Sequence, residues 1–265
     1  MKTFKPLLAV AVAIAFYSCS TVPLTGRSQL SLVSDDQINP AAAQSYRQLL
    51  SDPSTKVIAS GTDAQRVKRI GSQLATAIDR YLKANGYGDQ YNYQWEFNLI
   101  QSKEINAWCM PGGKVAVYSG ILPVTQTDAG LATVMGHEIG HAIAHHSAEA
   151  LSQQMAVQAG GAAVSVATGS KSQTTQALIG TLYGVGGQLA TLKYSRDKEN
   201  EADRLGLTFM AMAGYDPHLA VSFWQRMAAQ GKGAQPEFLS THPSDATRIA
   251  NIQKLVPEAM KYYKK

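Results

Sequence analysis

The chain has 265 residues, of which 45% are hydrophobic and 16% are charged, and its formal net charge is +5. This length allows one sizeable domain with a buried core, and the composition is that of a globular protein. The small positive charge is scattered, without a basic cluster interleaved with aromatic residues, so we expect no nucleic-acid partner.

The first 19 residues have the pattern of a lipoprotein signal peptide. Lys2 and Lys5 precede an unbroken apolar run of ten residues, which is too short to span a bilayer as a mature helix. The run is followed by Ser18 and Cys19, a small residue and a cysteine, as at a bacterial lipoprotein processing site. We therefore expect residues 1–19 to be a lipoprotein signal peptide and Cys19 to carry the lipid anchor. Two aromatic residues near the site depart from the usual pattern and leave a plain cleaved signal as the alternative.

The chain holds two cysteines, Cys19 and Cys109. If Cys19 is acylated, Cys109 is unpaired, and its apolar neighbours favour a buried hydrophobic role over a reactive thiol. If Cys19 is not acylated, the two could form a disulfide in an exported protein. The fold is not expected to depend on a disulfide in either case.

Residues 20–34 are polar and contain Pro23 and Gly26, which predicts a tether between the membrane and the domain. Helical patterns follow over residues 35–50 and, with a clear amphipathic period, over residues 63–83.

The hydrophobic period then changes from that of a helix to that of a strand. Apolar and polar residues alternate over residues 91–100, as in a half-buried strand. Residues 106–110 lead to a turn at Pro111-Gly112-Gly113, and residues 114–119 form a second predicted strand. Two short strands are therefore expected before the central helix.

That helix carries His137-Glu138-Ile139-Gly140-His141, with Asp128 as its predicted N-cap. Histidines four apart lie one turn apart on the same helix face and can bind one zinc ion. Glu138 can reach a water on that ion and act as general base, as in the H-E-x-x-H motif of metallopeptidases. The pentapeptide alone leaves a second interpretation, a buried helix whose histidines are merely hydrogen-bonded.

Residues 147–192 are rich in Ala, Gly, Ser and Gln and contain no apolar window long enough for a transmembrane helix. The pattern predicts two packed helices with a loop at 169–173, and the alternative is a mobile lid over the cleft. Helices are also expected over residues 193–213, after Asp216-Pro217, and over residues 244–256.

A catalytic zinc site needs a third protein ligand and one open position. His145 lies one turn further along the same helix, roughly 12 Å from the first ring, and cannot reach the same ion. Glu199 and Asp203 are four apart and share a helix face, whereas Glu201 is rotated away from it. We expect Glu199 to bind zinc and Asp203 to hydrogen-bond the free ring N–H of a ligand histidine. The alternative is a solvated, charged helix face.

Four separated motifs in this order resemble metallopeptidase family forty-eight, the HtpX and CAAX prenyl protease type. They are H-E-I-G-H with His146 downstream, S-R-x-x-E-x-E-A-D over Ser195 to Asp203, T-H-P over Thr241 to Pro243 with Arg248, and Pro111 to Gly120. The likeness covers about residues 30–260. It is closest to the soluble, lipid-anchored periplasmic branch of Gram-negative bacteria, the LoiP and BepA type. The prenyl-peptide substrates of the integral-membrane branch do not carry over, because this chain lacks the transmembrane helices of that branch.

The resemblance implies an α+β, mainly helical, zincin-type metallopeptidase domain over residues 35–265, with a small β-sheet beside the H-E-x-x-H helix. It implies one Zn²⁺ per chain, held by His137, His141 and Glu199, with Glu138 as general base. His242 matches a histidine near the metal that would stabilise the oxyanion or occupy the fourth zinc position; capping of the last helix is the alternative.

The resemblance also implies a place for the substrate. The matching residues of the cleft edge strand are Gly113, Lys114, Val115, Ala116 and Val117. An extended substrate could add to such a strand through backbone hydrogen bonds, which suits sequence-tolerant cleavage of unfolded chains.

The implied function is zinc-dependent endopeptidase cleavage of unfolded or misassembled envelope proteins. The implied partners are unfolded or misfolded proteins, the membrane through Cys19, and the outer-membrane assembly machinery. The expected location is the outer membrane, facing the periplasm. The competing reading is a periplasmic chaperone or assembly factor for outer-membrane proteins with latent protease activity.

Overall fold

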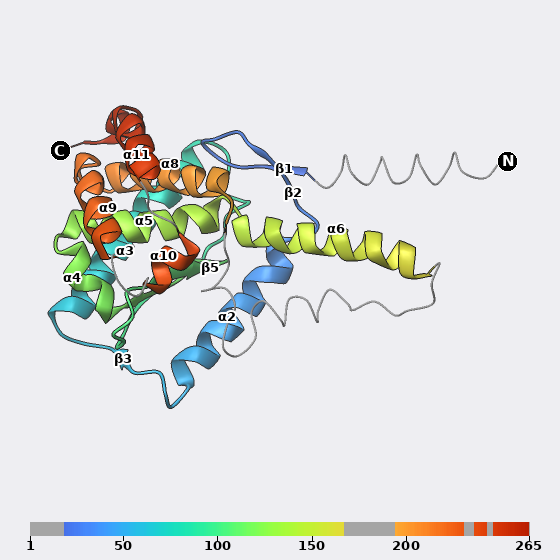
Figure 1. Ribbon diagram of the computed structural model, residues 1–265, viewed down its shortest axis with the longest axis horizontal. Helices are drawn as coiled ribbons and strands as arrows, with labels where there is room; N and C mark the ends of the chain where they lie inside the picture. Colours follow the sequence, from blue (N-terminus) through green and yellow to red (C-terminus); the bar gives the residue numbers. More distant parts are fainter. Residues whose placement is uncertain (1–18, 167–193, 231–235, 243–245, 265) are drawn as a thin grey trace.

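Helix α5 (Asp128–Ile143) lies at the centre of the computed structural model, which describes residues 19–166, 194–230, 236–242 and 246–264 (Figure 1). Every residue of α5 from position 129 to 143 is buried, as expected for a helix surrounded by protein on all sides. Its N-cap is Thr127, whose hydroxyl accepts a hydrogen bond from the backbone N–H of Gly130. The predicted cap, Asp128, is instead the first helical residue, where its carboxylate pairs with two arginines, Arg66 and Arg69.

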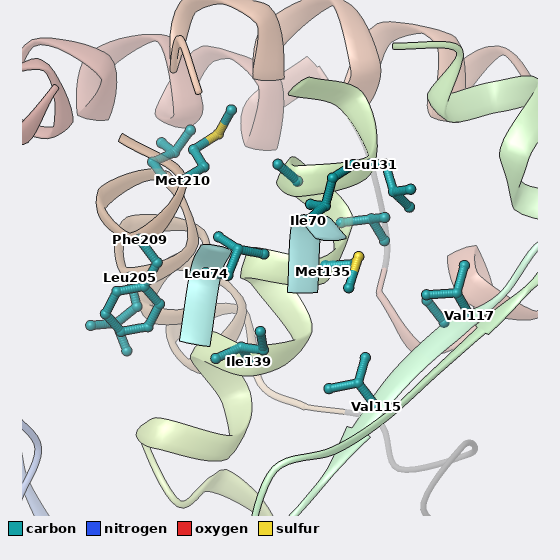
Figure 2. Packing of buried hydrophobic residues seen from close by; sticks show 14 of the residues in the cluster. Ile70, Leu74, Val115, Val117, Leu131, Met135, Ile139, Leu205, Phe209 and Met210 are labelled. Carbon is teal, nitrogen blue, oxygen red and sulfur yellow. The ribbon is translucent and has the colours of Figure 1, made fainter. Parts of the chain in front are cut away.

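Helices α3, α8 and α9 pack around α5, and α11 packs on α8 and α9. The helices outside α5 are α2 (Asp35–Ser51), α3 (Thr62–Ala84), α4 (Leu122–Thr125), α6 (His146–Val166), α8 (Arg196–Met212), α9 (His218–Gln230), α10 (Glu237–Thr241) and α11 (Ala246–Ala259), with 3₁₀ turns at Ser119–Ile121 and Met260–Tyr262. Figure 2 shows Leu131, Met135 and Ile139 of α5 between side chains of α3, α8 and the sheet. Within the described residues, no helix has both the length and the apolar character needed to cross a membrane.

Four strands form a mixed sheet beside α5, in the order β3-β4-β6-β5. The strands are β3 (Val57–Ile58), β4 (Glu96–Ile100), β5 (Ala107–Met110) and β6 (Lys114–Tyr118). β4 and β6 are parallel, and the two outer pairs are antiparallel. Helix α2 covers the other face of the sheet, where its Ile38 and Tyr46 pack with Trp108 and Ala116. The predicted class, mainly helical with a small sheet beside the H-E-x-x-H helix, is confirmed.

Two details of the strand prediction are wrong. Residues 91–95 precede strand β4 and are not part of it, although the backbone N–H of Gln94 donates to the carbonyl of Gly112. The hydroxyls of Tyr91 and Tyr93 donate to the carbonyls of Ile143 and Ala142 at the end of α5. The two tyrosines of this alternating segment therefore contact the C-terminal carbonyls of α5, where helices end without their full set of helical partners. In addition, residues 107–110 were expected to be a lead-in to the turn but form a strand of their own.

The chain changes direction abruptly after α5, which the sequence does not indicate. His145 has a positive φ of 53°, so the helix stops and α6 starts in a new direction at His146. His145 stacks on Tyr91 and pairs with Asp35, away from the other histidines. Of the region expected to hold two helices or a lid, residues 147–166 belong to α6, and the remaining residues, 167–192, lie outside the described ones.

The predicted tether is also wrong, because residues 20–34 are packed on the domain. β1 (Cys19–Thr21) and β2 (Ser28–Leu30) form an antiparallel hairpin. Val22 and Val33 are buried, and Arg27 forms ion pairs with Glu149 and Glu201. A polar composition alone therefore does not separate a solvated linker from a segment packed on the domain.

Substitution of two leucines, one buried and one partly exposed, tests which residues belong to the core. Leu74 of α3 is fully buried, whereas Leu219 of α9 is 45% exposed. Leu74→Ala should lower the free energy of unfolding by about 2–5 kcal/mol because it leaves a cavity. Leu219→Ala should change it by less than about 0.5 kcal/mol. Urea unfolding followed by circular dichroism measures both, and equal effects would contradict the packing described here.

Candidate metal centre

Four buried side chains converge between α5, α8 and the end of α10. On α5, the Nε2 atoms of His137 and His141 lie 3.1 Å apart. Glu199 of α8 brings one carboxylate oxygen within 3.5 Å of His137 Nε2 and the other within 3.4 Å of His141 Nε2. His242 follows α10, and its Nδ1 lies 2.9 Å from Glu199 Oε1. One ligand atom from each of the four lies within 4.8 Å of the others.

This donor set fits a zinc ion. Imidazole nitrogens and a carboxylate oxygen are ligands that zinc accepts in tetrahedral sites. Burial holds the pKa of His141 well below its ordinary value, so that its ring is neutral and offers a lone pair. Burial alone would raise the pKa of Glu199, but the three surrounding histidines lower it, which favours the carboxylate. Glu138 Oε1 is also buried and has no hydrogen-bond partner among the described residues. This oxygen is therefore available to accept a hydrogen bond from a bound water.

Glu138 lies directly against this cluster. Its Oε1 is 3.7 Å from His242 Nε2. Burial raises the pKa of Glu138 to about 7, against the opposing effect of the nearby His242. A divalent cation at the cluster would favour the ionised form, because opposite charge lowers the pKa of a carboxyl group. Beside a bound metal Glu138 would therefore be a carboxylate, the form that can accept a proton from water.

Asp203 and Arg248 form a buried support behind His137. His137 Nδ1 lies 2.9 Å from Asp203 Oδ1, a contact that directs Nε2 into the cluster. Arg248 donates to both Asp203 oxygens at 2.9 and 2.8 Å, and its Nη1 lies 3.0 Å from Glu199 Oε2. The guanidinium carbon also lies 3.6 Å from the ring centroid of Trp224. The sequence marked Arg248 only as part of a motif, and its partners are visible only in three dimensions.

Glycines allow α5 and α8 to approach closely enough to form the cluster. A Cβ at Gly140 would lie 2.8 Å from the carbonyl oxygen of Ala202, and one at Gly136 would lie 2.9 Å from that of Gly206. A Cβ at Gly206 would in turn lie 2.8 Å from the backbone nitrogen of His137. No ordinary side chain fits at these three positions, so the short distance between the helices depends on them.

The strand predicted to bind substrate is in the wrong place for that role. Residues 114–117 belong to β6, which pairs with β4 on one side and β5 on the other. Its backbone groups are therefore used on both sides, and no further strand can add to it. The sheet edge next to the cluster is β5. Residues 106–110 line a small cavity together with Glu138, His141 and His242.

Tyr194 was not identified from the sequence as a site residue. Its ring stacks on His141, with centroids 4.3 Å apart, and its hydroxyl lies 2.9 Å from the hydroxyl of Ser147. It lines the same cavity as β5. The available signal was its position immediately before the Ser195 to Asp203 motif, since the N-terminus of α8 also positions Glu199.

A buried H-E-x-x-H helix with a glutamate from a second helix, here α8, is typical of a zincin-type metallopeptidase. The chain belongs to peptidase family M48, whose model matches residues 62–256. Proteins of this family use zinc, and the four-residue cluster is able to hold one metal ion. The predicted family, enzyme class and cofactor are therefore confirmed.

Named relatives agree with this assignment. Mitochondrial metalloendopeptidase OMA1 of Schizosaccharomyces pombe is 32% identical over 258 residues, covering 97% of this chain and 72% of the relative. Metalloprotease YcaL of Escherichia coli is 28% identical over 260 residues, covering 96% and 97%. The beta-barrel assembly-enhancing protease of Escherichia coli is 29% identical over 251 residues, covering 91% and 48%. The chain spans half or less of several other OMA1 relatives.

The close approach of α5 and α8 can be tested with Gly206→Ala. On helix propensity alone this change would stabilise the protein by about 0.5–1 kcal/mol. Because the new methyl group would overlap the backbone of His137, we expect the opposite sign, a loss of about 1–3 kcal/mol in the free energy of unfolding. Gly88→Ala is the control, since its Cβ would meet a lysine side chain first. Urea unfolding measures both, and a stabilised Gly206→Ala protein would show that the helices have room.

Proposed function

We propose that the chain is a zinc-dependent endopeptidase that cleaves unfolded or misassembled envelope proteins, with Glu138 as its general base. The observation that carries this proposal is the buried Glu138 carboxyl group beside four converging ligand atoms. His137, His141 and Glu199 would hold the zinc ion. Bound zinc would polarise the scissile carbonyl and lower the pKa of the attacking water.

The residues of the chain would then divide the proton transfers and charge stabilisation between them. Glu138 would take a proton from the water and deliver it to the leaving amine, because its carboxylate lies directly against the ligand cluster. Asp203 would hold His137 in the tautomer that presents Nε2 to the metal. The His242 ring would first move out of the ligand cluster. It would then stabilise the oxyanion by donating a hydrogen bond.

The position of His242 favours a second candidate, a latent protease that serves as a chaperone or assembly factor. Its Nδ1 already lies among the ligand atoms of His137 and Glu199. In that position it would fill the fourth zinc position and exclude the water. Helix α11 begins at Ala246, and the His242 ring lies within the cluster, so the predicted alternative of a helix cap is less consistent with the geometry.

We propose that substrates add to the edge of β5 instead of to β6. This edge faces the cavity that contains Glu138 and His242. Backbone hydrogen bonds to an edge strand recognise any extended chain, which fits unfolded proteins as substrates.

We also propose that the protein is exported and lipid-anchored through Cys19 in the outer membrane, facing the periplasm. The apolar run and the Ser18-Cys19 pair support this location. One relative is named for enhancing beta-barrel assembly, which supports a role with the outer-membrane assembly machinery.

Casein cleavage by the purified protein and by Glu138→Gln tests the peptidase. Loss of the general base should lower the rate by about 10²–10⁴-fold without loss of zinc. Glu258→Gln, at a partly exposed ion pair with Arg204, is the control and should leave the rate unchanged. Zinc content is measured on the same samples, and absence of zinc from the unaltered protein would disprove the proposed centre.

If the protease is latent, the unaltered protein should bind zinc and yet fail to cleave casein. If the unaltered protein binds one zinc without cleaving casein, His242→Ala should release cleavage by opening the fourth position. A zinc-loaded but inactive His242→Ala protein would contradict latency at this residue.

Cross-linking distinguishes the two strands. An extended peptide that carries a photoreactive side chain, bound to Glu138→Gln, should attach to residues 106–110 and not to 114–117 when mapped by mass spectrometry. Attachment to 114–117 would contradict the sheet order described here, because those residues lie inside the sheet.

A further inference from the structure

The ring of His141 is held from behind by another histidine. His141 Nδ1 lies 2.7 Å from His146 Nδ1 at the start of α6. The other nitrogen of His146, Nε2, lies 3.0 Å from Glu201 Oε2 on α8. His146 is fully buried, and His141 and Glu201 are less than one-tenth exposed. A chain of hydrogen bonds thus leads from His141 to a carboxylate on a different helix.

With both imidazole rings neutral, only one arrangement of protons satisfies this chain. An ionised carboxylate can only accept, so Nε2 of His146 must donate to Glu201. A neutral His146 that donates from Nε2 has its lone pair on Nδ1, so Nδ1 accepts from Nδ1 of His141. The Nε2 lone pair of His141 is then free and points into the four-residue cluster. The contacts therefore select the tautomer of His141 that binds a metal.

The carboxylate at the end of the chain is fixed by the N-terminal hairpin. Thr25 Oγ1 donates to Glu201 Oε1 at 2.5 Å, and Arg27 Nε donates to Glu201 Oε2 at 2.6 Å. Arg27 also pairs with Glu149 of α6 at 3.0 Å. The buried Val22 holds the base of the same loop in the core. The loop therefore closes over Glu201 as part of the domain.

The two histidines of α5 are supported according to the same plan. Behind His137 stands a carboxylate, Asp203, clamped by an arginine, Arg248. Behind His141 stands Glu201, clamped by Arg27, with His146 inserted between the ring and the carboxylate. Arg248 holds Asp203 through two donors, Nε and Nη2. Arg27 gives Nε to Glu201 and Nη1 to Glu149, so it links the carboxylate of α8 to α6. In both cases a charged donor fixes the carboxylate.

We propose that Thr25 and Arg27 of the N-terminal hairpin are positioning residues of the metal centre, acting on His141 through Glu201 and His146. This inference rests on the proposed function, because it assumes that His141 binds the metal. It assigns to the hairpin the role that Arg248 has on the other side of the site. The hairpin would then influence metal affinity without contacting either the metal or the substrate.

Metal affinity tests the proposal on the purified full-length protein. Zn²⁺ affinity is measured by competition with a chromophoric chelator for Arg27→Met, Glu201→Gln and His146→Leu. We expect each to weaken zinc binding by about 10–100-fold, the usual effect of losing a group that orients a ligand. Arg204→Met is the matched control, since Arg204 also lies on α8 near the hairpin but pairs with Glu258 at the surface. Its affinity should stay within about 2-fold of the unaltered protein.

A spectroscopic readout separates positioning from a general loss of structure. The visible absorption of the Co²⁺-loaded protein should shift in Arg27→Met and Glu201→Gln, because the geometry at His141 changes, and should not shift in Arg204→Met. Arg27→Lys should recover part of the affinity lost in Arg27→Met, because it restores the charge but not the separate donors to Glu201 and Glu149. If the buried variants Glu201→Gln and His146→Leu do not fold, Arg27→Met and Thr25→Val still test the hairpin, as shown by equal thermal unfolding of the metal-free proteins.

The outcomes distinguish this proposal from the one on which it rests. If the unaltered protein binds one zinc and Arg27→Met binds it equally well with an unchanged Co²⁺ spectrum, the hairpin is not a positioning element, although the peptidase proposal stands. If the unaltered protein binds no zinc, both proposals are overturned.

Discussion

The close contact between α5 and α8 is the constraint on which the site depends. Two histidines on one helix can face the same point, but the third ligand must come from a second helix whose backbone is near enough for a short glutamate side chain. Gly136, Gly140 and Gly206 provide this closeness by leaving no Cβ at the crossing. Because close-packed interiors cannot absorb extra atoms without movement, a single methyl group at this crossing would affect both stability and the positions of the ligands.

Burying a cluster of charged and polar groups costs free energy unless every charge has a partner. Here the carboxylates of Glu199 and Asp203 contact Arg248, which in turn lies over Trp224. Such pairs do not necessarily add stability, but removing one partner leaves an uncompensated buried charge. The same network fixes ring orientations before any metal arrives, so that little reorganisation is needed on binding. Folding and metal affinity are therefore expected to be coupled in this protein.

The sequence predicts those parts of the site that depend on local periodicity. The spacings of His137 and His141 and of Glu199 and Asp203 each follow from one helical turn, and the structure places these four side chains as that spacing requires. Strand order is not local: alternation cannot show that β6 lies inside the sheet and β5 at its edge. The hairpin was missed for the same reason, because the partners of Arg27 lie 122 and 174 positions away in the chain.

The docked hairpin also has a geometric consequence for where the enzyme can work. A flexible tether would let the active site move through a wide volume above a bilayer. In this structure β1 begins at Cys19, and the loop that contacts Glu201 starts only six residues later, a stretch that spans at most about 20 Å. An acyl chain on Cys19 would therefore keep the metal centre close to the bilayer, within a distance set by the packed hairpin.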